Sequence, residues 1–126
     1  MNKAVWFLQV IVALAFTGAG GAKLATAGSE LRANPNMAWS TDFSDPELKM
    51  IGSAEVAGAL GLILPAATGI APVLTPVAGV ALGALMGGAV VVHLQRDESP
   101  VVPLVLGLLA ITAGLLRWQQ QRRRGA

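Results

Sequence analysis

Cysteine is absent from this chain, and charged residues are scarce. Without cysteine there is no disulfide, no thiol nucleophile and no cysteine-ligated metal or iron–sulfur centre. Charged residues make up 13% of the chain, about half of the roughly 25% that is usual in soluble domains. The single histidine cannot complete a metal coordination shell with scattered carboxylates. The sequence therefore predicts no metal site, and no serine, histidine and acid arrangement of a hydrolase is visible.

Hydrophobic residues, in contrast, form long runs. They make up 54% of the 126 residues, and the mean hydropathy is +0.62. A soluble chain of this length buries only about two-thirds of its surface, so much of this apolar content would face water. Four runs approach the length that crosses a bilayer core, at about 4–24, 46–66, 73–93 and 100–117. Short connections between them predict an all-α fold, a four-helix transmembrane bundle with antiparallel neighbours, in one domain over residues 1–126.

The first apolar run has a signal peptide as its alternative interpretation. Ala25-Thr26-Ala27 resembles a small-residue cleavage site. The run itself covers about 19 residues, which exceeds the usual 7–15 of a signal core. We therefore expect residues 4–24 to stay in the protein as a spanning helix.

Local signals predict where the helices begin and end. The polar stretch 28–49 is predicted to be a loop with a turn at residues 34–36. Asp45, followed by Pro46 and Glu47, is predicted to cap the second long helix. The tail QQQRRRGA, after the last apolar run, is predicted to be frayed.

Glycines are spaced for close contact between helices. Gly79, Gly83 and Gly87 recur every four residues and predict a flat stripe on one helix, against which a second backbone can pack. Gly52 and Gly58 flank Glu55 on a face of small residues and predict packing against another helix. The stripe does not tell whether its partner is in the same chain or in another copy.

Three ionisable residues, Lys23, Glu55 and His93, fall inside or at the edge of the apolar runs. A charged side chain in the middle of a membrane helix costs about 3 kcal/mol, so Glu55 must be neutral, hydrogen-bonded or paired. The topology places all three at the same end of the bundle, below the loop residues Trp39 and Asp42. We expect a polar cluster there, with Lys23 and Glu55 as an ion pair. The cluster is a candidate ligand site; a self-satisfied structural pair is the alternative.

Basic residues predict the orientation in the membrane. Lys3, Arg117 and the arginines at 122–124 lie on one side of the predicted bundle. The positive-inside rule then places both termini in the cytoplasm. Three arginines without interleaved aromatic residues do not predict a nucleic-acid surface.

The order of several short segments resembles the DoxX-like family of small bacterial membrane proteins. These segments are Ala22-Lys23-Leu24, MAWSTDF at 37–43, LKMIGSAE at 48–55, GLILP at 61–65, Leu74-Thr75-Pro76, and Gly88-Ala89 with His93. The resemblance implies a multi-pass four-helix protein of the bacterial inner membrane. It also implies an association with quinone-linked redox complexes, but no settled activity.

Three functions stay open at this point. The first is a non-enzymatic accessory or scaffold subunit, which docks a redox or envelope partner or forms a homo-oligomer in the lipid bilayer. The second is a binder of a quinone or a lipid headgroup at Lys23, Trp39, Asp42, Glu55 and His93. The third is a small proton-coupled transporter that uses Glu55. An enzyme is the less favoured interpretation, because no catalytic set is visible.

Overall fold

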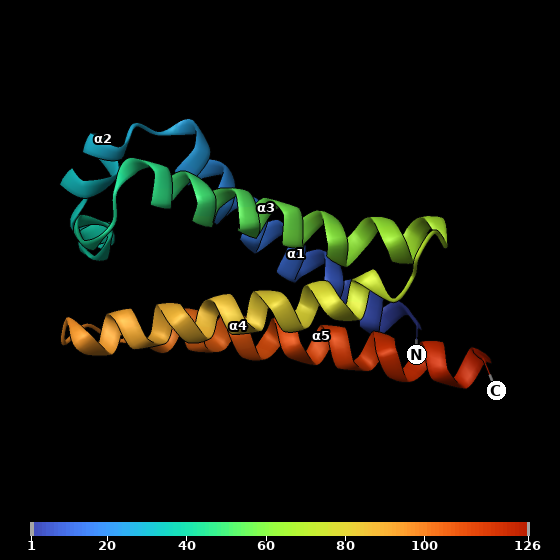
Figure 1. The fold of residues 1–126 in the computed structure, drawn as a ribbon. Coiled ribbons are helices and arrows are strands. Elements are labelled where there is room, and N and C mark those ends of the chain that lie inside the picture. Colours follow the sequence, from blue (N-terminus) through green and yellow to red (C-terminus); the bar gives the residue numbers. More distant parts are fainter. Residues whose placement is uncertain (1, 126) are drawn as a thin grey trace.

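The computed structural model describes residues 2–125 and is built from helices (Figure 1). Its long helices are α1 (Asn2–Ala25), α3 (Asp45–Thr68), α4 (Leu74–Gln95) and α5 (Val101–Gly125). A short helix α2 (Gly28–Ala33) and a 3₁₀ helix η1 (Pro35–Asp42) connect α1 to α3. All four long helices are long and apolar enough to cross a membrane, and residues 2–125 contain no β-strand. The predicted all-α four-helix bundle is confirmed.

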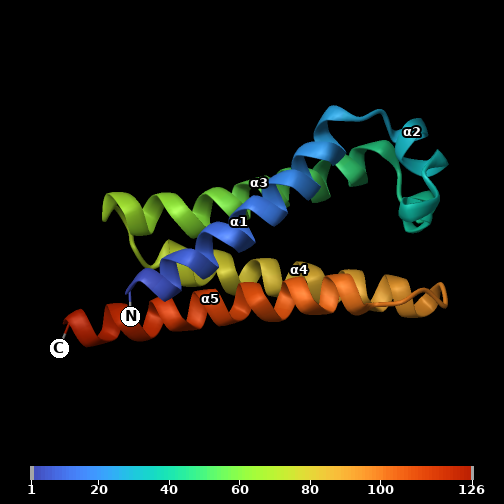
Figure 2. The same ribbon diagram turned by 180° about the vertical axis from the view of Figure 1, so that it is seen from behind.

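The long helices form two antiparallel pairs, α1 with α3 and α4 with α5. The pairs join where α3 packs on α4 and α1 packs on α5. Both termini lie at one end of the bundle, and α2, η1 and the α4–α5 turn lie at the other (Figures 1 and 2). We call these the terminal end and the loop end.

Glycines allow the close approach within each pair. A Cβ atom placed on Gly20 of α1 would lie 2.6 Å from the carbonyl oxygen of Gly52, and one on Gly52 would lie 2.9 Å from that of Gly20. In the other pair, a Cβ atom on Gly79 of α4 would lie 2.6 Å from the carbonyl oxygen of Ala110 and 2.8 Å from the Cα atom of Gly114 in α5. Helix pairs in membranes commonly associate through such contacts between small residues.

The predicted glycine stripe on α4 contacts α5 over only part of its length. Gly79 and Gly83 face α5, where a Cβ atom on Gly83 would collide with the side chain of Ile111. A Cβ atom on Gly87 would meet no described atom within 4 Å. Four-residue spacing advances about 40° per step on a helix of 3.6 residues per turn. Gly87 is therefore rotated about 80° from Gly79. Within the described chain the stripe meets α5 at Gly79 and Gly83, and the packing predicted at Gly87 stays a prediction.

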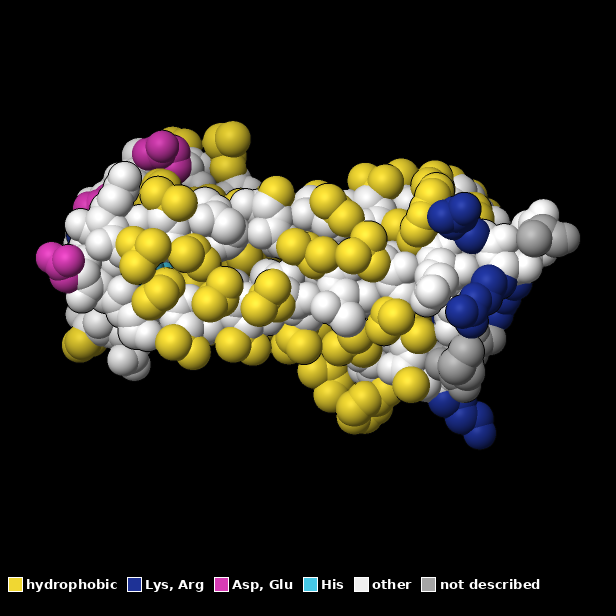
Figure 3. Space-filling model, turned by 90° about the horizontal axis from the view of Figure 1, so that it is seen from below, with side chains coloured by type: hydrophobic (Ala, Val, Ile, Leu, Met, Phe, Trp, Pro, Cys, Tyr) yellow, Lys and Arg dark blue, Asp and Glu magenta, His cyan; other side chains and the backbone are white. Residues whose placement is uncertain are grey.

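The core lies where the two pairs meet, and Gly58 of α3 packs there on Leu82 of α4. The buried residues at its centre are Val12, Phe16, Leu62, Leu82, Met86 and Ala110. Outward faces of the helices carry exposed leucine, valine and isoleucine side chains. Apolar side chains spread over the length of the bundle, with acidic groups at the loop end and basic groups at the terminal end (Figure 3). This distribution suits a bilayer, where lipid solvates the apolar faces.

The start of α3 differs from the prediction. Ser44, in extended conformation, is the N-cap: its hydroxyl accepts from the Glu47 amide at 3.3 Å, and its own amide donates to Glu47 Oε1 at 2.9 Å. The predicted cap, Asp45, is already inside the helix, so its carboxylate cannot fold back onto the first free amides. It forms an ion pair with Arg32 of α2 instead, which ties α2 to the start of α3.

The start of α4 compensates for a proline inside α3. The helix ends at Gly69, whose φ of 72° is the left-handed conformation that glycine adopts most easily. Pro65 has no amide hydrogen, which leaves the carbonyl of Gly61 without its helical donor. The hydroxyl of Thr75 in α4 donates to that carbonyl at 3.0 Å. The proline is therefore tolerated, because the neighbouring helix supplies the missing hydrogen bond.

The polar tail is helical and not frayed as predicted. Helix α5 continues to Gly125, through glutamines and arginines that have good helix propensity. The side-chain amide of Gln121 donates to the carbonyl of Pro72 at 2.8 Å. This contact docks the last turns of α5 against the α3–α4 turn, which short-range sequence signals do not reveal.

Candidate functional site

A cavity of about 410 Å³ lies between the two helix pairs towards the loop end. Ligand pockets commonly have about 300–1,000 Å³. Most of its wall is apolar and comes from α3, α4 and α5, including Ile51, Leu85, Met86, Val92, Val102 and Leu106. Its polar wall consists of Lys23, Trp39, Glu55 and His93. The fold thus brings together four of the five residues predicted to bind a ligand.

Lys23 and Glu55 form the innermost polar group of this wall. The Nζ atom of Lys23 lies 2.7 Å from Oε1 of Glu55, and the two side chains are 8% and 3% exposed. A Cβ atom on Gly20 would lie 2.9 Å from the Cβ of Glu55, and one on Gly52 would lie 2.9 Å from the Cβ of Lys23. Each charged residue therefore occupies space left by a glycine on the opposite helix. The predicted ion pair is present.

Trp39 of η1 lies between the lysine and the histidine. The Nζ atom of Lys23 is 5.6 Å from the centre of the Trp39 ring, within the range of a cation–π contact. The His93 ring centre is 6.4 Å away, and Phe43 packs edge-on against Trp39 at 5.7 Å. Trp39 and Phe43 thus form the part of the cavity wall that belongs to the loop end.

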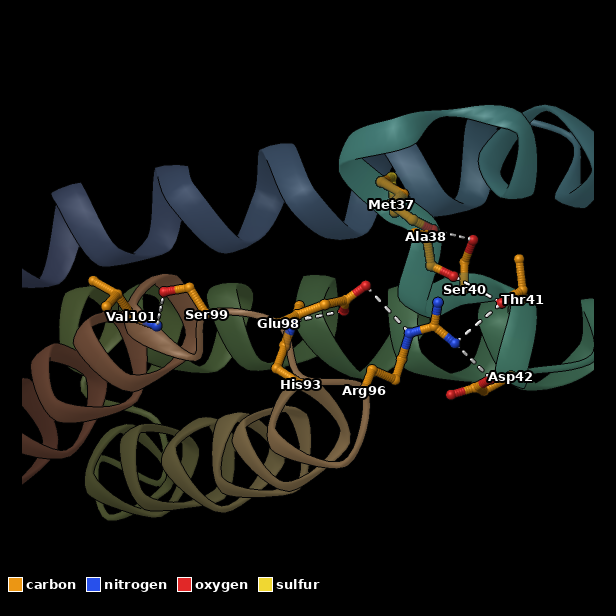
Figure 4. Close-up of polar contacts among 10 residues, drawn as sticks. All are labelled: Met37, Ala38, Ser40, Thr41, Asp42, His93, Arg96, Glu98, Ser99 and Val101. Atoms are coloured by element: carbon orange, nitrogen blue, oxygen red, sulfur yellow. Dashed lines mark hydrogen bonds and ion pairs between the residues drawn. The ribbon is translucent and has the colours of Figure 1, made fainter.

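Arg96 connects the α4–α5 turn to η1 (Figure 4). Its guanidinium donates to Asp42 Oδ1 at 2.8 Å, to Thr41 Oγ1 at 3.3 Å and to Glu98 Oε2 at 3.2 Å. Hydrogen bonds with Asp42 and then Glu98 raise the pKa of Arg96 above its ordinary value, so the guanidinium stays charged. The other carboxylate oxygen of Glu98 lies 3.1 Å from Nδ1 of His93. We call the group formed by Thr41, Asp42, His93, Arg96 and Glu98 the Arg96 bridge.

The bridge gives Asp42 and His93 different positions relative to the cavity. Asp42 is exposed and outside the cavity wall. The structure therefore places it with Arg96 and away from the four residues inside. His93 belongs to both groups, because its Nδ1 atom faces Glu98 while its ring lines the cavity. Its Nε2 atom is then the ring nitrogen that can meet a ligand.

The cavity offers binding groups and no metal cluster. Within residues 2–125, no three side chains of histidine, cysteine, aspartate or glutamate lie close enough together to hold a metal ion. An ammonium group, a carboxylate, an imidazole and an indole face surround one end of an apolar chamber. Such a site can hold a molecule that has a polar head with hydrogen-bonding groups and an apolar remainder.

A second polar cluster lies on α1 and α5 and was not predicted. Gln9 and Arg117 are buried, at 0% and 4% exposure. The Gln9 amide donates to the carbonyl of Leu62 at 2.6 Å, and its oxygen accepts from Nε of Arg117 at 2.7 Å. The Arg117 guanidinium also lies 4.7 Å from the centre of the Trp6 ring. The available sequence signal was Gln9, a lone amide in an apolar run, whereas Arg117 was interpreted only as an orientation signal.

Lys49 has a structural role that the sequence did not suggest. Its Nζ atom donates to the carbonyls of Lys23 at 2.6 Å and of Thr26 at 2.7 Å. The last carbonyls of a helix lack partners within the helix, and a lysine can supply them. Lys49 of α3 therefore secures the end of α1, and with it the position of Lys23.

Comparison with known proteins gives one result that covers most of the chain. The model of the DoxX-like family matches residues 7–115, a segment that contains all four polar residues of the cavity wall. No curated protein and no solved structure matches the chain.

Proposed function

The chain belongs to the DoxX-like family, and on this premise we propose that it is a membrane protein that binds a quinone-class ligand in the cavity between its two helix pairs. One observation carries the proposal: an apolar chamber of about 410 Å³ has the buried Lys23–Glu55 pair, Trp39 and His93 in a single wall. A self-satisfied structural pair would not need an adjoining chamber.

The chemistry of a quinone suits this wall. A quinone carbonyl needs a hydrogen-bond donor, which the Lys23 ammonium can supply. Nδ1 of His93 faces the Glu98 carboxylate and carries the proton of the neutral ring, so its Nε2 atom can accept from a hydroxyl of the reduced ligand. The flat ring can stack on Trp39, since aromatic rings pair in offset or edge-on arrangements. A reduced ligand carries hydroxyl groups, and these can donate to the Glu55 carboxylate. The apolar side chains of α4 and α5 leave a slot for a hydrocarbon tail.

We place the protein in a bacterial inner membrane with both termini in the cytoplasm. Five of the nine lysines and arginines lie at the terminal end, and four lie at or towards the loop end. The compact cluster at 122–124 favours this orientation by the positive-inside rule. The cavity then belongs to the outer half of the bilayer. A ligand that partitions into lipid reaches that depth without crossing water.

The accessory-subunit hypothesis was favoured by the glycine stripe together with the lack of a visible catalytic set. Gly79 and Gly83 meet α5 of the same chain, so they no longer require a partner protein or a second copy. Of the three stripe glycines, Gly87 meets no described atom within 4 Å and stays open to an outside contact. We therefore rank ligand binding ahead of the accessory role, and ahead of a proton-coupled transporter.

The test is a titration of the detergent-purified protein with a decyl-tailed benzoquinone, followed by tryptophan fluorescence. We expect saturable quenching, because Trp39 borders the cavity. Trp118→Phe is the matched control: Trp118 lies outside the cavity wall, so this variant should quench as the wild type does. Trp39→Phe should lose most of the quenching. A wild-type protein that shows no saturable quenching, and retains no added quinone in native mass spectrometry, would refute the proposal.

A further inference from the structure

The acidic residues of the bundle are confined to its loop end, whereas basic residues lie at both ends: Lys23, Arg32, Lys49 and Arg96 at or towards the loop end, and the others at the terminal end. At the terminal end, where α1 begins and α5 ends (Figure 1), the described basic residues are Lys3, Arg117, Arg122, Arg123 and Arg124. The seven acidic residues of the chain all fall within 30–55 and 97–98, which lie at or towards the loop end. The terminal end of the described structure therefore has basic groups without acidic neighbours to neutralise them.

A shallow groove of about 580 Å³ runs along the last turns of α5 within this basic region. Its lining residues are Leu115, Leu116, Trp118, Gln119, Arg122 and Arg123. Leu115, Trp118 and Arg122 are spaced by three and four residues, which places them on one helix face. Leu115 and Trp118 are 53% and 44% exposed. The groove thus changes from apolar to basic along its length.

We propose that this groove binds an anionic phospholipid of the surrounding leaflet. Its phosphate would contact Arg122 and Arg123, and one acyl chain would lie along Leu115, Leu116 and Trp118. Arg122 lies about 6 Å further along the helix than Trp118. Tryptophan side chains favour the membrane–water boundary, so the arginines reach the level of the headgroups. The order of apolar and charged groups along the groove therefore matches that of a lipid.

Arg117 adds to the attraction for an anion. Its guanidinium is buried, and its described partners are the neutral groups of Gln9 and Trp6. No salt bridge joins Arg117 to a carboxylate of the described residues. Arg117 does not line the groove, so it adds to the positive field of the terminal end and makes no direct contact with the phosphate. The occupant we infer is a lipid and not an acidic protein, because exposed leucines and a tryptophan form half of the groove.

The experiment compares lipid retention in native mass spectrometry, with the full chain reconstituted in equal amounts of phosphatidylglycerol and phosphatidylcholine. Wild-type protein should retain phosphatidylglycerol preferentially. Basic residues near a membrane surface contribute about 1 kcal/mol each, so Arg122→Gln/Arg123→Gln should lower this preference by about tenfold or more. The matched control is Lys3→Gln/Arg124→Gln, which removes two charges from the same end but none from the groove. It should keep most of the preference.

Two results would overturn the lipid site. The first is a wild-type protein without preference for the anionic lipid. The second is an equal loss in both double variants, which would assign the effect to the general positive field of the terminal end. Circular dichroism should show the same helix content in all variants, because the four substituted side chains are exposed.

Discussion

The Lys23 ammonium and the Glu55 carboxylate meet because Gly20 and Gly52 oppose each other one turn away. The glycines allow the backbones of α1 and α3 to approach, and each charged side chain extends past the glycine of the other helix to a separation of 2.7 Å between Nζ and Oε1. The two residues are 32 positions apart in the chain, at 23 and 55. Helix packing, and not local structure, therefore brings the charges together.

This pair should show strong thermodynamic coupling. Removal of one partner from a buried ion pair costs about 3–5 kcal/mol, so Lys23→Met and Glu55→Gln should each destabilise the protein strongly. The double variant should lose much less than the sum, because neither change then leaves an unpaired buried charge. The free energies of unfolding of the wild type, the two single variants and the double variant, measured in mixed detergent micelles, complete this double-mutant cycle. Asp45→Asn, in a pair whose aspartate side chain is 63% exposed, should cost less than about 1 kcal/mol. Additive losses would argue against the coupling.

The cavity can be filled at Gly88 without disturbing the bundle. A Cβ atom would meet no described atom within 4 Å at either Gly87 or Gly88, but only Gly88 lines the cavity. Gly88→Leu should therefore weaken binding of the decyl-tailed benzoquinone at least tenfold and leave the fold unchanged. Gly87→Leu makes the same chemical change one residue away and should bind as the wild type does. Equal affinity of the two variants would place the ligand elsewhere.

Gly79 should be the least replaceable glycine of α4. A methyl group there would meet the Ala110 carbonyl and the backbone of Gly114, and backbone atoms cannot move as a flexible side chain can. We expect Gly79→Ala to destabilise the protein by about 1–3 kcal/mol. Gly87→Ala should be neutral or stabilising by up to about 1 kcal/mol, because alanine favours a helix and the space is open. The same detergent unfolding measures both, and a neutral Gly79→Ala would mean that α4 and α5 pack less tightly than described.

Loss of the Arg96 bridge should loosen η1 over the cavity. Arg96→Gln removes the charged donor that joins the α4–α5 turn to Asp42. Partly exposed ion pairs contribute up to about 1 kcal/mol, so hydrogen exchange at residues 39–43 should accelerate by up to about fivefold. Asp97→Asn is the control, since Asp97 has a φ of 55°, which asparagine also adopts, and forms no ion pair in the described structure. Unchanged exchange in Arg96→Gln would show that η1 is held by Trp39 and Phe43 alone.

Part of the site could be predicted because few ionisable residues interrupt the apolar runs. Once the helices alternate in direction, Lys23, Glu55 and His93 must lie near the same end, and a buried carboxylate needs a partner. The sequence did not predict the Gln9–Arg117 contact, because its partners are 108 residues apart and their contact depends on how α1 and α5 are rotated. The cap at Ser44 was missed for a smaller reason: a shift of one residue decides whether a side chain can reach the free amides.

The amino-acid sequence by itself determined a membrane protein of four antiparallel helices, because apolar runs of bilayer length leave no other way to satisfy their backbone groups. It also determined that Lys23, Glu55 and His93 lie towards the same end of the bundle. Only the tertiary structure decided that Lys23, Trp39, Glu55 and His93 share one cavity while Asp42 lies outside it. It also decided that Gly87 stays free of α5 and that Arg117 is buried against Gln9. These outcomes depend on the rotation and divergence of packed helices, which a pattern of hydrophobic residues leaves undetermined.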